Sequence, residues 1–126
     1  MTDYKKQSNC VYACEYHIVF TSKYRRKIFT KGIGEYLGKR FGEIRKHYPE
    51  IDIMEYNYDK DHIHILCSFH PKYSIGEIVR KIKSITAREL FKSFPDLKKN
   101  LWGGEFWSDG YYVGTVGEGG NWKVVE

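Results

Sequence analysis

At four places in the chain, hydrophobic and polar residues alternate with the two-residue period that is typical of β-strands. The predicted strands cover residues 10–20, 51–58 and 62–69, and a fourth begins at Gly110. Only the polar turn at residues 59–61 separates the second strand from the third. We therefore expect these two strands to form an antiparallel hairpin.

Two other segments follow the helical repeat instead. Across residues 32–48, apolar side chains recur at the spacing of one helical face, and Pro49 ends the segment. A second helix is predicted to begin at Ser74, because Ser74 and Glu77 match a capping box. Pro95 lies just past its expected end.

The order strand, helix, strand, strand, helix, strand predicts an α+β fold of the ferredoxin-like, RRM-like βαββαβ type. In this fold both helices cover one face of an antiparallel sheet and leave the other face open to a ligand. After the fourth strand, "NWKVVE" begins like a helix with Asn121 as N-cap. We therefore expect one domain over residues 1–126, truncated within its C-terminal helix.

Composition fits one packed domain, with 126 residues of which 41% are hydrophobic. No apolar run approaches the ~20 residues that cross a bilayer, and the N-terminus lacks the apolar stretch of a signal peptide. We therefore expect a cytoplasmic protein. Three cysteines without a CxxC pair argue against a disulfide framework and a thiolate zinc site.

The formal net charge of +5 is concentrated in two segments, "KYRRK" at residues 23–27 and the stretch from Lys72 to Lys92. Aromatic residues make up 17% of the chain. Cations interleaved with aromatic rings suit single-stranded nucleic acid, because phosphates need charge and unpaired bases need stacking faces. Solvated lysines and core tyrosines explain the composition equally well.

The segment "DHIHI" places two histidines in the third predicted strand. Alternate strand residues share a face, so His62 and His64 project together with Cα atoms ~6.6 Å apart. Imidazoles at that separation can converge on one metal ion. The alternative is a pair of partly exposed strand histidines without a role. We interpret His17 and His47 as structural or incidental.

Four stretches, in order, carry a specific resemblance. They are "YHIVFTSKYRRKIF", "DHIHILCSF", "PKYSIGEIVRKIKSITARELF" and "LWGGEFWSDGYYVGTVG". Together they resemble the single-tyrosine HUH transposases of the insertion-sequence-200/605 family of bacteria and archaea, whose HUH motif is histidine, hydrophobic residue, histidine. The resemblance covers most of the chain from about Tyr16 onward.

This resemblance implies an enzyme that cuts and rejoins single-stranded DNA at hairpins near the ends of a mobile element. It implies His62 and His64 as ligands of a divalent ion, Mg²⁺ or Mn²⁺. A tyrosine would attack the phosphate to form a 5′-phosphotyrosine. That tyrosine, and a glutamine ligand, are expected just after Glu126, so no nucleophile is assigned within residues 1–126.

The resemblance also implies a homodimer, and we expect the free edge of the first strand to allow pairing between two copies. The basic segments become candidate contacts to hairpin DNA. The candidate DNA-binding residues are Lys23, Tyr24, Arg25, Arg26, Lys27, Arg80, Lys81, Lys83, Ser84 and Arg88.

Two other functions remain open. One is a non-catalytic single-stranded nucleic-acid-binding module, although the third strand lacks the base-stacking aromatic pattern of an RNA-recognition motif. The other is a two-histidine phosphoesterase, which would need a second HxH motif. The sequence contains one.

Overall fold

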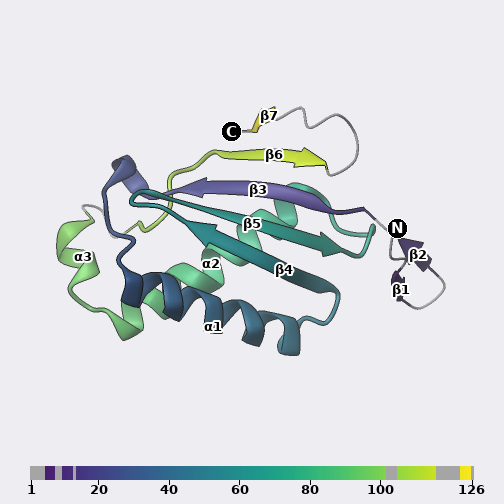
Figure 1. Cartoon of the computed structure of the whole chain (residues 1–126), viewed down its shortest axis with the longest axis horizontal. Helices are drawn as coiled ribbons and strands as arrows, with labels where there is room; N and C mark the ends of the chain where they lie inside the picture. The colour runs from purple at the N-terminus through teal and green to yellow at the C-terminus, as the bar shows by residue number, and fades with distance from the viewer. Residues whose placement is uncertain (1–4, 8–9, 13, 102–104, 116–122, 126) are drawn as a thin grey trace.

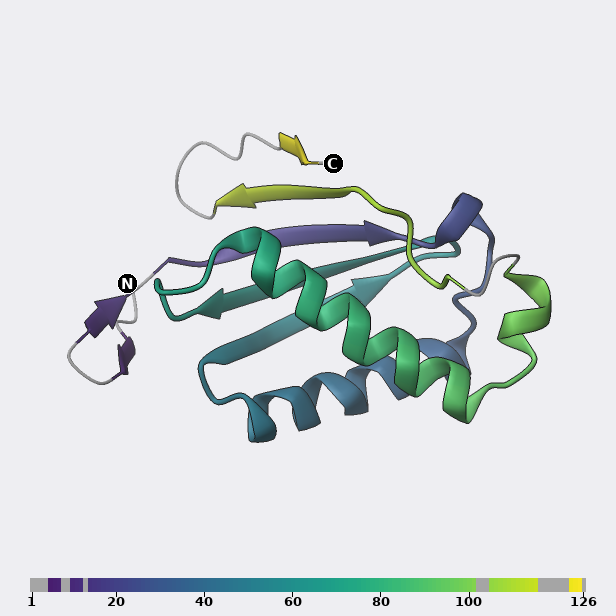
Figure 2. The same cartoon turned by 180° about the vertical axis from the view of Figure 1, so that it is seen from behind.

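In the computed structural model, two long helices cover one face of a five-stranded antiparallel sheet (Figures 1 and 2). The structure describes residues 5–7, 10–12, 14–101, 105–115 and 123–125. The elements in chain order are β1 (Lys5–Gln7), β2 (Cys10–Tyr12), β3 (Tyr16–Thr21), η1 (Lys23–Arg25), α1 (Lys31–His47), β4 (Ile51–Tyr58), β5 (His62–Phe69), α2 (Ile75–Ser93), α3 (Leu97–Asn100), β6 (Tyr111–Thr115) and β7 (Lys123–Val125).

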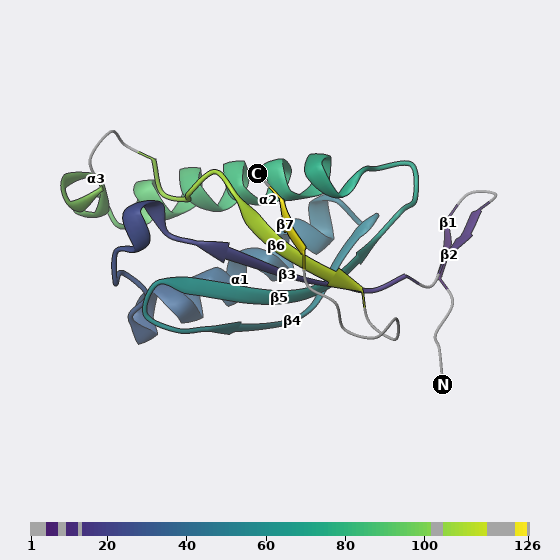
Figure 3. The same cartoon turned by 90° about the horizontal axis from the view of Figure 1, so that it is seen from above.

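The main sheet has the strand order β4-β5-β3-β6-β7. The predicted α+β ferredoxin-like fold is confirmed, with β4 and β5 paired as the expected antiparallel hairpin. Viewed from above, both long helices lie on the same side of this sheet (Figure 3). One expectation is wrong: β3 pairs with β5 and β6 on its two sides, so it offers no free edge to a second copy.

The long first strand expected over residues 10–20 is divided. Its first part, β2, pairs with β1 in a separate two-stranded sheet, and its second part, β3, enters the main sheet at Tyr16. Tyr16 pairs with Thr115, the last residue of β6. The apolar alternation continues upstream of Tyr16, but Cys14 and Glu15 belong to no strand.

The C-terminal helix expected from "NWKVVE" is also wrong over residues 123–125, which form β7 and pair antiparallel with β6. Val124 and Val125 are β-branched and favour a strand over a helix. The edge of β6 that does not pair with β3 provides the pairing partner for these residues. The proposed N-cap Asn121 lies outside the described residues.

The core lies between the sheet and the helices. Ile18 and Phe20 of β3 and Ile63 and Ile65 of β5 are fully buried. Helix α2 begins with the predicted capping box, in which Ser74 accepts from the Glu77 amide and Glu77 accepts from the Ser74 amide. No helix of the described residues is long and apolar enough to cross a membrane.

A β-bulge at Met54 changes which residues of β4 face the helices. Ile53 pairs with Cys67, and the next paired residue is Glu55, opposite Leu66. Tyr56 and Tyr58 therefore lie on the helix side, where a Cβ added at Gly38 or Gly34 of α1 would overlap their rings. Glycine at these two positions lets α1 pack closely on the sheet.

Candidate metal and nucleic-acid site

The two histidines of "DHIHI" lie on the sheet face that the helices leave uncovered. His62 and His64 are half-buried, whereas the alternating Ile63 and Ile65 are fully buried beneath the helices. On this open face His64 lies between Asn57 of β4 and Val19 of β3. The strand therefore carries both imidazoles on one face, as its alternation predicted.

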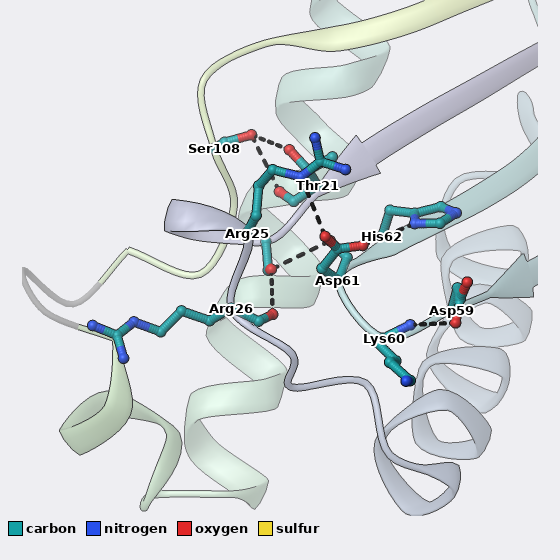
Figure 4. A network of polar contacts seen from close by, with 9 residues as sticks. Thr21, Arg25, Arg26, Asp59, Lys60, Asp61, His62 and Ser108 are labelled. Carbon is teal, nitrogen blue, oxygen red and sulfur yellow. Dashed lines mark hydrogen bonds and ion pairs between the residues drawn. The ribbon is translucent and has the colours of Figure 1, made fainter.

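Asp61 connects His62 to the basic segment. One carboxylate oxygen lies 3.0 Å from Nδ1 of His62, and the other accepts from Nε of Arg25 at 3.2 Å (Figure 4). The hydrogen bond with His62, followed by that with Arg25, lowers the pKa of Asp61. This carboxylate stays ionised and holds the two groups at the same end of the sheet.

His64 meets a third imidazole. Nδ1 of His17, on β3, lies 2.8 Å from Nε2 of His64, and the ring centroids are 4.8 Å apart. Burial lowers the pKa of His64, and the neighbouring His17 and His62 lower it further. His64 therefore favours the neutral form, which is the form that binds metal.

His62, His64 and the oxygen atoms near them could supply some of the ligands of a divalent ion. A pocket of about 280 Å³ is lined by the two histidines together with Asn57, Tyr58 and Asp59. Among the residues that the structure describes, no group of three or more His, Cys, Asp or Glu side chains is arranged to hold a metal. Two imidazoles beside oxygen donors form a partial coordination shell that other ligands would complete.

The basic segment after β3 is fixed against the turn that precedes His62. The backbone amide of Ser22 donates to the carbonyl of Asp61 at 2.9 Å, and that of Phe29 donates to Lys60 at 3.1 Å. Lys23 pairs with Glu105 at 2.8 Å, whereas Tyr24, Arg25, Arg26 and Lys27 are exposed. Four of the five candidate DNA contacts in this segment thus face solvent, and Arg25 is linked to His62 through Asp61.

The candidates on α2 divide into two groups. Arg80, Ser84 and Arg88, spaced four residues apart, form one exposed ridge. Lys81 lies over the ring of Tyr48, 4.4 Å from its centroid. Lys83 is half-buried and donates to three consecutive carbonyls, those of Ser108 at 2.7 Å, Asp109 at 3.2 Å and Gly110 at 3.1 Å. Burial lowers the pKa of Lys83.

A second pocket, of about 670 Å³, lies between α2 and residues 105–111. Its lining combines Arg80 and Ser84 with the aromatic side chains of Phe106, Trp107 and Tyr111. The amide of Lys23 donates to the carbonyl of Phe106 at 2.8 Å. Two residues of the exposed ridge of α2, Arg80 and Ser84, thus line a pocket whose other wall is bonded to the basic segment after β3.

The sequence interpretation missed the partners of the two histidines. Asp61 stands next to His62 in the printed motif, and its carboxylate could have been considered as an orienting group. His17, interpreted from the sequence as structural or incidental, contacts His64 through the pairing of β3 with β5. The shared face of His17 and Val19 was predictable, but the register that brings His17 to His64 was not.

Comparison with known proteins identifies a family. The family model described as "Transposase IS200 like" matches residues 10–126. The chain is 32% identical over 114 residues to the ISDra2 transposase TnpA of Deinococcus radiodurans, covering 90% of this chain and 81% of that protein. It is 35% identical over 122 residues to the transposase for insertion sequence element IS200 of Salmonella typhimurium, covering 94% and 77%.

Solved structures agree on the fold. A crystal structure from Deinococcus radiodurans R1, of a protein assigned as a transposase, superimposes with a TM-score of 0.79 at 31% identity. That superposition covers 90% of this chain and 87% of the other. A REP-associated tyrosine transposase bound to a REP hairpin gives a TM-score of 0.54 at 12% identity, covering 92% and 62%. At that identity it supports the fold alone.

Proposed function

The chain belongs to the IS200-like transposase family, a family of DNA-processing enzymes, and on that premise we propose that it acts on hairpin single-stranded DNA at the ends of a mobile element. The reaction is cleavage and rejoining through a tyrosine–DNA covalent intermediate, with His62 and His64 holding a divalent ion, Mg²⁺ or Mn²⁺. The nucleophilic tyrosine and a glutamine ligand belong, by the family resemblance, to residues that follow Glu126.

One observation carries this proposal: the two imidazoles share the open face of the sheet, and Asp61 joins one of them, His62, to Arg25 of an exposed basic segment. A bound divalent ion supplies Lewis-acid polarisation and orientation of a phosphate. His62 and His64 hold that ion at the face where DNA can approach. Asp61 orients the ring of His62 through the bond to Nδ1.

The exposed cations supply affinity for the DNA backbone. Arg26 and Lys27 of the segment after β3, and Arg80 and Arg88 on α2, are exposed and available for phosphate contacts. Such contacts fix the orientation of the DNA but carry little sequence preference. A REP-associated tyrosine transposase with this fold binds a REP hairpin, and the proposal extends a ligand of that kind to this chain.

We also propose a homodimer, as the family resemblance implies. Because β3 is enclosed between β5 and β6, strand pairing between two copies would use an outer strand of the sheet, β4 or β7.

The test is cleavage of an end-labelled DNA hairpin by the complete protein in the presence of Mn²⁺. We expect His64→Ala to reduce cleavage by more than about 10-fold, because loss of a ligand should exceed the effect of losing an outer partner. His47→Ala, at the exposed end of α1, is the matched control and should cleave like the wild type. Equal cleavage by all three proteins would refute the metal role. Hairpin binding without cleavage by any of them would favour the non-catalytic binding module.

A further inference from the structure

The contact between His17 and His64 joins two strands that are remote in sequence. In the register of β3 with β5, His17 lies opposite Leu66 and Val19 lies opposite His64, so the two histidines are diagonal neighbours on the open face. Their rings meet through nitrogen atoms, Nδ1 of His17 and Nε2 of His64, at 2.8 Å. This contact engages one particular nitrogen of His64.

The contact at His62 involves Nδ1, whereas the contact at His64 involves Nε2. Nδ1 of His62 lies 3.0 Å from a carboxylate oxygen of Asp61 (Figure 4). An ionised carboxylate only accepts hydrogen bonds, so the proton is on Nδ1 of His62 and Asp61 accepts it. In a neutral imidazole the lone pair is then on Nε2. The two histidines of the motif are thus held through different ring nitrogens.

We propose that His17 is a positioning residue, which accepts a hydrogen bond from Nε2–H of His64 and so assigns Nδ1 of His64 as its metal-binding atom. This inference rests on the proposed function, in which both histidines of the motif are ligands. His62 then binds through Nε2, so the motif coordinates one ion asymmetrically. His17 and Asp61 act in the same way. Each accepts a hydrogen bond from the ring N–H of its histidine, and the other ring nitrogen of that histidine binds the metal.

Proton counting selects this direction for the bond. A neutral imidazole carries one N–H and one lone pair. If His17 donated instead, the lone pair at Nε2 of His64 would be engaged and its Nδ1 would carry the proton. His64 would then have no nitrogen with which to bind a metal. Only donation from His64 to His17 is compatible with coordination by a neutral His64 while the contact persists.

The direct test is long-range ¹H–¹⁵N NMR of the histidine rings in the complete protein, first without metal at pH 7.5. We expect the Nε2–H tautomer for His64 and the Nδ1–H tautomer for His62. His17→Leu removes the acceptor and should abolish the preference at His64. His17→Asn restores an acceptor near the position of Nδ1 and should recover it. His47→Leu, remote from the site, should change neither ring.

The ligating nitrogen is then read with ¹¹³Cd²⁺ as the probe, through one-bond coupling to ¹⁵N. We expect coupling at Nδ1 of His64 and Nε2 of His62. Coupling at Nε2 of His64, or at His17, would overturn the role of His17 and leave the histidine pair as a metal site. Coupling at neither His62 nor His64 would overturn the proposed function itself.

Metal affinity provides a second readout. Mn²⁺ binding by calorimetry should weaken by about 10–100-fold in His17→Leu and recover in His17→Asn. Thermal unfolding of each variant separates this effect from loss of fold. If His17→Leu fails to fold, the wild-type tautomer and coupling pattern still decide the question.

Discussion

The two faces of β5 differ in what their side chains do. Ile63 and Ile65 point to the helices and are fully buried in an apolar core. His62 and His64 alternate with them, point to the open face and contact polar groups from β3 and the preceding turn. One strand of eight residues thus contributes packing through one set of positions and candidate chemistry through the other. Substitutions at adjacent positions should therefore have separate consequences.

The difference between the two faces of β5 is tested most directly by truncating one side chain on each face, Ile65 on the covered face and His64 on the open face. Ile65→Ala leaves a cavity beneath the helices and should lower the free energy of unfolding by about 2–5 kcal/mol. His64→Ala removes a half-buried ring from the open face, and the loss in free energy of unfolding should stay below about 1.5 kcal/mol. Urea unfolding of both variants measures the difference. Equal losses would show that the open face contributes to stability as much as the core does.

The packing of the covered face can be tested at glycines of α1. Gly34→Ala places a methyl group in the ring of Tyr58 and should destabilise the fold by about 1–3 kcal/mol. At Gly42 an added Cβ meets nothing within 4 Å, so Gly42→Ala should instead stabilise by about 0.4–1 kcal/mol. Thermal unfolding should show shifts of opposite sign. Shifts of the same sign would mean that the sheet does not restrict this helix.

The smallest expected effect concerns an ion pair at the end of the sheet. Lys72 lies 3.0 Å from Glu50, and its hydrogen bond is the main cause that lowers the pKa of Glu50, with a further contribution from Tyr73. A lowered carboxyl pKa stabilises the fold above pH ~4.5 and loses that contribution as the pH falls through the lowered value. Glu50→Gln should therefore melt slightly below the wild type at pH 7.

The two melting temperatures should converge as the pH falls through the lowered pKa of Glu50, because the carboxyl group of the wild type then becomes protonated. The matched variant Lys72→Met should show the same convergence. A gap for Glu50→Gln that did not narrow at all with falling pH would assign the effect to packing rather than to charge.

Local pattern predicted much of this molecule. Alternation and turn residues gave residues 51–58 and 62–69 as strands, in agreement with β4 and β5. Helical spacing with Pro49 gave residues 32–48, within one residue of α1 at each end. These elements were predictable because their own side chains determine period, burial and boundaries.

Features that depend on distant partners were not predictable. The division between β2 and β3 depends on the pairing of β2 with β1, and β7 depends on the open edge of β6. The contact between His17 and His64 depends on strand register. Lys83 is a candidate DNA contact by its charge, yet its ammonium group lies against three carbonyls of the residues that directly precede β6.

Because of the bulge at Met54, a change in the length of β4 should disturb the packing of this strand more than most substitutions in it. Upstream of the bulge the odd-numbered residues Ile51 and Ile53 point inward, and downstream the even-numbered Tyr56 and Tyr58 do so. Deleting Met54 together with the bulge would keep every other residue of β4 on its present face. Deleting or inserting one residue between Glu55 and Tyr58 would instead exchange tyrosine for Glu55 or Asn57 under the helices. In evolutionary terms, this strand can accept many substitutions and few changes of length.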